Sequence, residues 1–184
     1  MAQRRIALLV GSLRKESLNR RLAWAVARLA PSELVFEEVR IDDLPLYSQD
    51  FDQAYPPAAA RLKRDVEGAA ALLIVTPEYN RSIPGVLKNA LDIGSRPWGK
   101  NSFAGKPAAI LGTSPGAVGT ALAQQHLRSV LAYLDVAVLG QPEVYVQFKE
   151  GLITDQGEIG TDTTREFLQS FVDRYVQWLD RMLG

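Results

Sequence analysis

The segment TPEYNRSIPG, residues 76–85, combines several side chains that bind small molecules. It follows directly on the apolar run AALLIV, which predicts a strand buried on both faces. Two prolines stiffen the segment, while Tyr79 offers an aromatic body with a polar tip and Asn80 can donate and accept hydrogen bonds. Such a loop suits a flat molecule with polar edges. The alternative is a rigid connection with Glu78 in solvent.

Two further segments follow apolar runs and carry small polar residues. GSLRKESLN, residues 11–19, places hydroxyls, an amide and the cation Arg14 ahead of a helical pattern, and the free N–H groups of a helix N-terminus suit a phosphate. The alternative is that Ser17 only caps the helix and Arg14 is solvated. In GTSPGAVG, residues 112–119, glycines allow close backbone approach, and Thr113 and Ser114 add hydroxyls.

Apolar runs that predict strands alternate with segments of helical periodicity along the chain. We expect strands at 6–10, 34–41, 70–75, 107–111 and within 136–146, and helices at about 18–30, 58–67, 84–92, 117–134 and 162–183. Charged residues interrupt the second strand, which suits an edge, and Pro142 should interrupt the fifth. This alternation predicts one parallel sheet covered on both faces, so we expect residues 1–184 to form a single doubly wound α/β domain.

In an open α/β sheet, ligands bind beyond the carboxyl ends of the strands, where the strand order reverses. The three segments should therefore surround one ligand, with a phosphate over the first and a flat ring between the other two. FMN fits this arrangement better than a nucleoside triphosphate, because the G-x-x-x-x-G-K-[ST] loop is absent. It also fits better than NAD, since the G-x-G-x-x-G fingerprint is missing.

In their order and spacing, these three segments resemble the NADPH-dependent FMN reductase family, which includes bacterial quinone and chromate reductases and azoreductases. The resemblance extends along nearly the whole chain, and P-E-Y-N is its most specific part. It implies a flavodoxin-like fold, a five-stranded parallel sheet with helices on both faces, with tightly bound FMN and a homodimer or homotetramer. The implied activity passes electrons from NADPH or NADH through FMN to a quinone, flavin, chromate or azo-type acceptor.

The resemblance assigns FMN contacts to all three segments. The implied contacts are Ser12, Leu13, Arg14, Ser17, Leu18 and Asn19 around the phosphate, Pro77, Glu78, Tyr79 and Asn80 at the ring and ribityl chain, and Thr113, Ser114 and Gly116 at the ring. No general acid, base or nucleophile is expected, because the cofactor carries the chemistry. Arg81 stands where some quinone-reducing relatives carry an aromatic residue.

A flavodoxin-like electron carrier, which binds FMN without oxidising NAD(P)H, is the alternative from another class. Such carriers tend to be strongly acidic, whereas this chain has 21 Lys and Arg against 21 Asp and Glu. The balance also gives no support for a nucleic-acid partner. The single histidine, His126, is expected to be a structural or interface residue. One histidine and no cysteine give no basis for a zinc site or thiol catalysis.

The N-terminal region has an apolar run too short for a signal peptide or a membrane span, so we expect a cytoplasmic protein with no membrane partner. Residues 42–58 form a long loop with three aromatic residues, and loops of this length are usually functional or interfacial. Gln124, Gln125 and Arg128 lie on the polar side of the fourth expected helix. A homo-oligomer with loop 42–58 near a neighbour's flavin would explain both features. Ordinary solvent exposure is the alternative.

Overall fold

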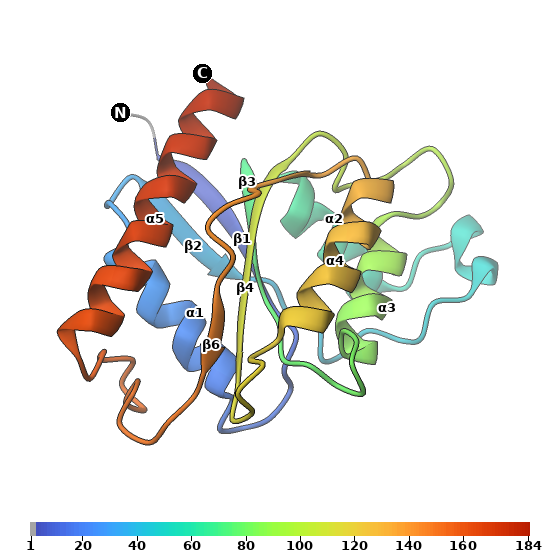
Figure 1. Cartoon of the computed structure of the whole chain (residues 1–184). Coiled ribbons are helices and arrows are strands. Elements are labelled where there is room, and N and C mark those ends of the chain that lie inside the picture. The colour runs from blue at the N-terminus through green and yellow to red at the C-terminus, as the bar shows by residue number, and fades with distance from the viewer. Residues whose placement is uncertain (1–2) are drawn as a thin grey trace.

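The computed structural model describes residues 3–184. Its elements in chain order are β1 (Arg4–Val10), α1 (Leu18–Leu29), β2 (Leu34–Glu38), the 3-10 helix η1 (Gln49–Gln53), α2 (Pro57–Glu67), β3 (Ala71–Val75), α3 (Gly85–Gly94), β4 (Pro107–Ser114), α4 (Ala121–Tyr133), β5 (Ala137–Val138), β6 (Tyr145–Gln147) and α5 (Asp162–Leu183). Figure 1 shows strands and helices alternating from β1 to α4.

The strands form a parallel sheet in the order β2-β1-β3-β4-β5, with β6 as a further short strand on β4. This is the flavodoxin-like strand order, so the predicted fold class is confirmed. All five residues of the central strand β3 are buried, as its unbroken apolar sequence requires. β2 lies at the edge and ends in the exposed Glu37 and Glu38, as predicted.

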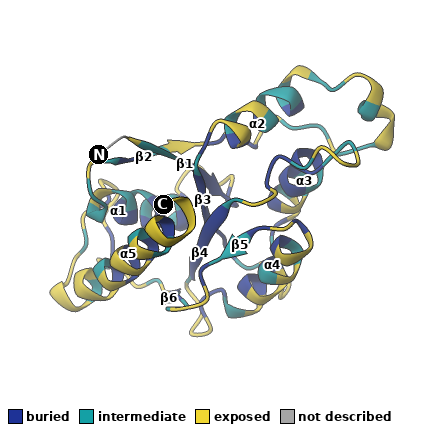
Figure 2. Cartoon of the chain, turned by 90° about the horizontal axis from the view of Figure 1, so that it is seen from above, coloured by how far each residue is buried: buried dark blue, intermediate teal, exposed yellow. Residues whose placement is uncertain are grey.

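The sheet separates two apolar clusters, because successive side chains of a strand point to opposite faces. Leu8 and Leu73 face α1 and α5, where Leu22 and Phe171 are buried. Leu9 and Ile74 face the other side, which α2, α3 and α4 cover. In Figure 2 the central strands β3 and β4 are dark blue between helices whose outer faces are exposed. None of the helices within residues 3–184 combines the length and apolarity needed to cross a membrane.

The carboxyl-terminal part of the sheet differs from the expectation in two ways. The fifth strand is split, because Pro142, which has no N–H to donate, stands between β5 and β6. β4 extends beyond the expected residue 111 to Ser114, because β6 supplies pairing partners for its last three residues. The helix expected at 117–134 begins only at Ala121, since a turn with Gly119 at φ 61° precedes it.

Candidate functional site

The loops after β1, β3 and β4 lie together at the lower edge of the sheet in Figure 1. Their first residues contact one another directly. Gly11 N–H donates to Val75 O at 2.8 Å, and Thr76 N–H donates to Leu111 O at 3.0 Å. A Cβ atom added to Gly112 would lie only 2.2 Å from Thr76 O, so only glycine allows this approach of β4 to β3. The parallel sheet therefore brings the three predicted segments to one place.

The loop after β1, residues 11–17, leads into the N-terminus of α1. The Ser17 hydroxyl accepts from Arg20 N–H at 3.1 Å and so caps the helix. Ser12 is buried and Leu18 is half-buried, whereas Leu13 and Arg14 are exposed. The loop thus presents the apolar side chain of Leu13 and the cations Arg14 and Lys15 at its surface.

The backbone of this loop provides a row of free donors. Among the described residues, no protein group accepts the N–H groups of Ser12, Leu13, Arg14, Leu18 and Asn19. Free N–H groups next to a helix N-terminus favour an anion, because the positive end of the helix dipole adds to them. This backbone geometry is suited to a phosphate.

Asn19 joins the loop after β1 to the end of β4. Its Nδ2 donates to Thr113 O at 2.9 Å, and its Oδ1 accepts from Thr113 N–H at 3.0 Å. Both residues are buried, so the paired bonds satisfy the side-chain amide of Asn19 and the backbone N–H and C=O of Thr113, which water does not reach. The Asn19 side chain holds the two loops at a fixed separation, and its amide is engaged with the protein.

Residues 79–82 form a tight turn in the loop after β3. Tyr79 and Ser82 exchange backbone hydrogen bonds of 2.9 and 3.0 Å, and both central residues have positive φ, 51° for Asn80 and 65° for Arg81. Positive φ at both central positions is the signature of a type I′ turn, in which asparagine is favoured. Pro77, which precedes the turn, is buried, while Tyr79 is half-exposed at 50%.

Glu78 points away from solvent, toward α4. One carboxylate oxygen accepts from Leu122 N–H and Ala123 N–H, both at 3.1 Å, and the other pairs with Arg81 at 3.3 Å. Its side chain is only 9% exposed. The alternative of a solvated Glu78 is therefore wrong, because its carboxylate accepts hydrogen bonds from the N-terminus of α4.

The third loop is held largely by its own hydroxyl groups. Thr113 Oγ1 donates to Val146 O at 2.8 Å, and Ser114 Oγ donates to Gly119 O at 2.6 Å. Gly116 is exposed, and a Cβ atom there would meet nothing nearer than Ser114 Oγ at 3.6 Å. The space beside Gly116 is therefore open to a ligand.

The polar residues of α4 differ from the expectation of a free surface. Gln124 is fully buried and donates to Val144 O at 2.8 Å, and Arg128 donates to Leu139 O at 3.0 Å. Both side chains therefore hold the chain around Pro142 in place, and Gln124 does not face solvent or a partner. Gln125 is exposed. His126 Nδ1 lies 2.9 Å from Ser82 Oγ, a structural contact to the turn after β3.

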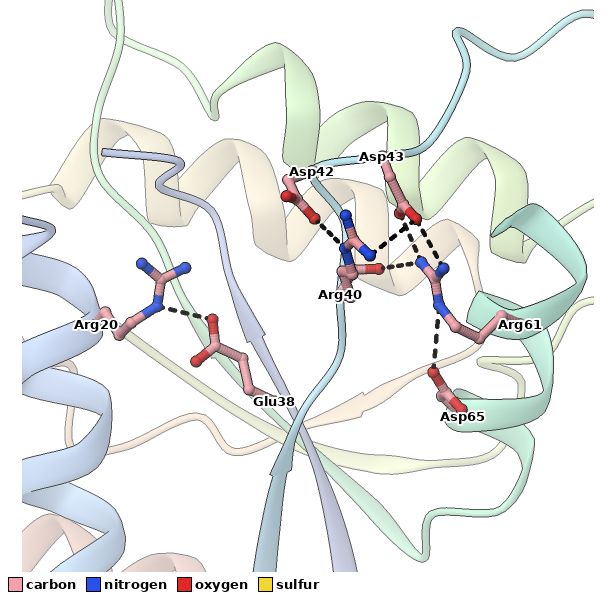
Figure 3. Close-up of polar contacts among 7 residues, drawn as sticks. All are labelled: Arg20, Glu38, Arg40, Asp42, Asp43, Arg61 and Asp65. Atoms are coloured by element: carbon pink, nitrogen blue, oxygen red, sulfur yellow. Dashed lines mark hydrogen bonds and ion pairs between the residues drawn. The ribbon is translucent and has the colours of Figure 1, made fainter. Parts of the chain in front are cut away.

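Figure 3 shows a network of charges at the start of loop 42–58. Arg61 of α2 binds the Asp43 carboxylate with two bonds of 2.7 and 2.8 Å and donates to Arg40 O at 3.0 Å. Arg40 pairs with Asp42 at 2.8 Å, and these contacts keep the pKa of Asp43 and of Asp42 below the ordinary value of a carboxyl group. This network fixes the path of the chain where it leaves β2.

The rest of loop 42–58 is tied to α3. Asn89 accepts from Tyr47 N–H at 2.8 Å and donates to Pro45 O at 2.9 Å. Tyr55 donates its hydroxyl to Ile93 O at 3.0 Å, and burial raises the pKa of Tyr55 to about 12. Leu46 remains 82% exposed, and in Figure 1 the cyan segment around η1 projects from the molecule. The loop is anchored at both ends and exposed in its middle.

The chain matches a family described as NADPH-dependent FMN reductase over residues 4–151. It is 55% identical to a 2-hydroxy-1,4-benzoquinone reductase of Burkholderia sp, over 95% of this chain and 96% of that protein. It is 47% identical to a quinone reductase of Pseudomonas putida, over 95% of this chain and 94% of that protein. The solved structure of FerB from Paracoccus denitrificans, a flavoenzyme NAD(P)H:(acceptor) oxidoreductase, matches with a TM-score of 0.94 and 43% identity over 97% of this chain and 98% of that chain.

Proposed function

This chain belongs to the NADPH-dependent FMN reductase family and is an NAD(P)H-dependent FMN and quinone reductase, and we propose that it holds FMN at the three loops described above. The observation that carries this proposal is the convergence of free backbone donors on the carboxyl edge of β1, β3 and β4. The first loop holds donors for a phosphate. The other two provide donors and an aromatic residue for a flat ring.

The donors of the loop after β1 fit the phosphate of FMN. The N–H groups of Ser12, Leu13, Arg14, Leu18 and Asn19 lack a protein acceptor within residues 3–184, and Arg14 adds a cation at the surface of the loop. We assign the phosphate to this loop, where Ser12, Ser17 and Leu18 would line the phosphate site. In this assignment Asn19 fixes the third loop against the first and makes no side-chain bond to the phosphate.

The loops after β3 and β4 fit the ring. In the part of the chain that the structure describes, the N–H groups of Glu78, Asn80 and Gly116 donate to no protein group, so they are available to the carbonyl oxygens of a flavin. Tyr79 is positioned at the exposed surface of its turn, and Pro77 is buried. Thr113 and Ser114 hold the third loop so that Gly116 leaves room for the ring edge.

Bound FMN supplies hydride acceptance from NADPH or NADH and electron transfer to the acceptor. The residues of this chain bind and orient the cofactor and leave one side of the site open beside the half-exposed Tyr79 and Leu13. We propose a quinone as the physiological acceptor, because relatives at 55% and 47% identity are named as quinone reductases. These relatives also disfavour the electron-carrier alternative.

An absorbance spectrum of the purified protein, repeated after anaerobic addition of NADPH, tests this function. We expect a flavin spectrum that bleaches with NADPH alone and returns when a benzoquinone is added. A flavin spectrum unchanged by both NADPH and NADH would support the carrier. Failure of the protein to bind added FMN would overturn the cofactor assignment.

Replacing Arg14 with alanine should weaken FMN binding about tenfold, because a charge-assisted hydrogen bond to the phosphate is lost. Titration of the FMN-free protein with FMN, followed by the quenching of flavin fluorescence, measures the change. Arg165→Ala is the matched control, because Arg165 is also exposed but lies on α5. Equal FMN affinity in both variants would show that Arg14 does not bind the phosphate.

We further propose that the protein forms a homodimer or homotetramer in which loop 42–58 lies near a neighbour's flavin. The projecting position of the loop supports this, since loops of this length are usually functional or interfacial. Light scattering at micromolar protein concentration should give two or four times the mass of one chain. The mass of a single chain would contradict the proposal.

A further inference from the structure

The N-terminus of α4 is capped by a residue from another loop. Thr120 occupies the N-cap position, but within residues 3–184 its side chain makes no cap bond; it accepts instead from Gln124 Nε2 at 2.9 Å. The N–H groups of Leu122 and Ala123 are satisfied by the Glu78 carboxylate, at 3.1 Å each. A side-chain oxygen ordinarily reaches these donors from the N-cap itself. Here the cap connects the loop after β3 to the helix after β4.

A second contact joins the same two segments. His126, one turn further along α4, lies with Nδ1 2.9 Å from the hydroxyl of Ser82, at the far end of the turn that begins at Tyr79. The loop after β3 is thus attached to α4 on both sides of its turn. Two attachments fix the orientation of a segment as well as its distance from the helix.

Glu78 faces two ways. Its carboxylate is directed at α4, while its backbone N–H and that of Asn80 have no protein acceptor among the described residues. From this division we propose that Glu78 is a positioning residue that sets the separation between the second and third loops, and thereby the width of the space for the flavin ring. The proposal rests on the FMN assignment above. It adds a role for the Glu78 side chain that involves no contact with the ligand.

The charge of Glu78 has a separate consequence. A carboxylate at the N-terminus of α4 offsets the positive end of the helix dipole and the nearby guanidinium of Arg81. Glu78→Gln keeps an oxygen that can accept from the same N–H groups but removes this negative charge. The site becomes more positive, so a flavin bound there should be easier to reduce, with its midpoint potential shifted to a more positive value.

Three variants separate these effects. Glu78→Ala removes both the attachment and the charge, Glu78→Gln removes the charge, and Thr161→Ala removes the side-chain cap of α5, where Thr161 Oγ1 accepts from Thr164 N–H at 3.2 Å. Thr161→Ala is the matched control, because it also loses a helix cap but at a helix start outside the three loops. FMN affinity, hydrogen exchange of the FMN-free protein and the flavin potential are then compared.

We expect Glu78→Ala to weaken FMN binding by about tenfold or more, because small displacements of a binding loop are costly. Hydrogen exchange should rise together at 76–84 and at the start of α4, in the FMN-free protein as well. Glu78→Gln should retain FMN affinity within about threefold and shift the flavin potential upward. Thr161→Ala should leave the affinity and the exchange of both segments unchanged.

Equal FMN affinities in Glu78→Ala and Thr161→Ala would overturn the positioning role, as would faster exchange in α4 alone. If wild-type protein failed to bind FMN, the proposed function would fail. Faster hydrogen exchange in both segments of Glu78→Ala would still show that Glu78 attaches the loop after β3 to α4. If Glu78→Ala did not fold, Glu78→Asp would decide, because its shorter side chain keeps the charge but reaches the N–H groups of Leu122 and Ala123 less well. Wild-type FMN affinity together with wild-type exchange of both segments in Glu78→Asp would count against the role.

Discussion

Replacing Asn19 with alanine should lower the free energy of unfolding by about 3 kcal/mol, because it leaves two buried backbone groups without partners. Thr113 N–H and Thr113 O both depend on the Asn19 amide, at 3.0 and 2.9 Å. The same substitution releases the end of β4 from the start of α1. FMN binding should therefore weaken as well, because the loops that hold the phosphate and the ring lose their fixed separation.

Asn101 provides a matched control for this prediction. Its amide also bonds two backbone groups, accepting from Phe103 N–H at 3.0 Å and donating to Leu134 O at 2.7 Å, but it precedes β4 and lies at the opposite edge of the sheet. Urea unfolding and FMN titration of Asn19→Ala and Asn101→Ala should show stability losses in both and an affinity loss only in the first. Unchanged stability of Asn19→Ala would show that the Asn19 amide does not bond the backbone of Thr113.

Gly112→Ala is expected to cost about 3 kcal/mol of stability, the upper end of the usual range for overpacking. The added Cβ would lie 2.2 Å from Thr120 Oγ1 and 2.2 Å from Thr76 O. The hydroxyl can rotate away, but the carbonyl belongs to the backbone at the end of β3. Relief therefore requires β3 and β4 to separate at the edge where the three loops meet, and FMN retention should fall with stability.

Gly140→Ala is the control for Gly112→Ala. An added Cβ at Gly140 meets no atom within 4 Å, and the residue is exposed beyond β5. Its unfolding free energy should stay within about 0.5 kcal/mol of wild type. Denaturant unfolding monitored by circular dichroism measures both variants. A Gly112→Ala protein as stable as Gly140→Ala would mean that the two strands are not in close contact.

Much of the fold follows from local features of the sequence. The apolar runs 6–10 and 70–75 become the buried strands β1 and β3, because a strand covered on both faces can carry hydrophobic residues at every position. Glycine, proline and small polar residues mark where strands end, so the positions of the three loops follow from the amino-acid sequence. The parallel topology then implies that these loops share one edge of the sheet.

The partners of individual polar groups could not be predicted in the same way. Glu78 caps a helix that begins more than 40 residues later, and Asn19 bonds a residue 94 positions away. The burial of Gln124 and the split of the fifth strand likewise depend on the course of the chain between α4 and β6. Nothing in the neighbouring sequence distinguishes these side chains from solvated ones.

The sequence by itself therefore determined which segments are strands, where they end and which residue types gather at the ends of β1, β3 and β4. Hydrophobic periodicity reports burial locally, and glycine and proline restrict the backbone at their own positions. Only the tertiary structure decided which of the gathered polar groups bond one another and which remain free. A carboxylate or an amide accepts any donor within about 3 Å, and the folded chain alone brings such distant groups to that distance.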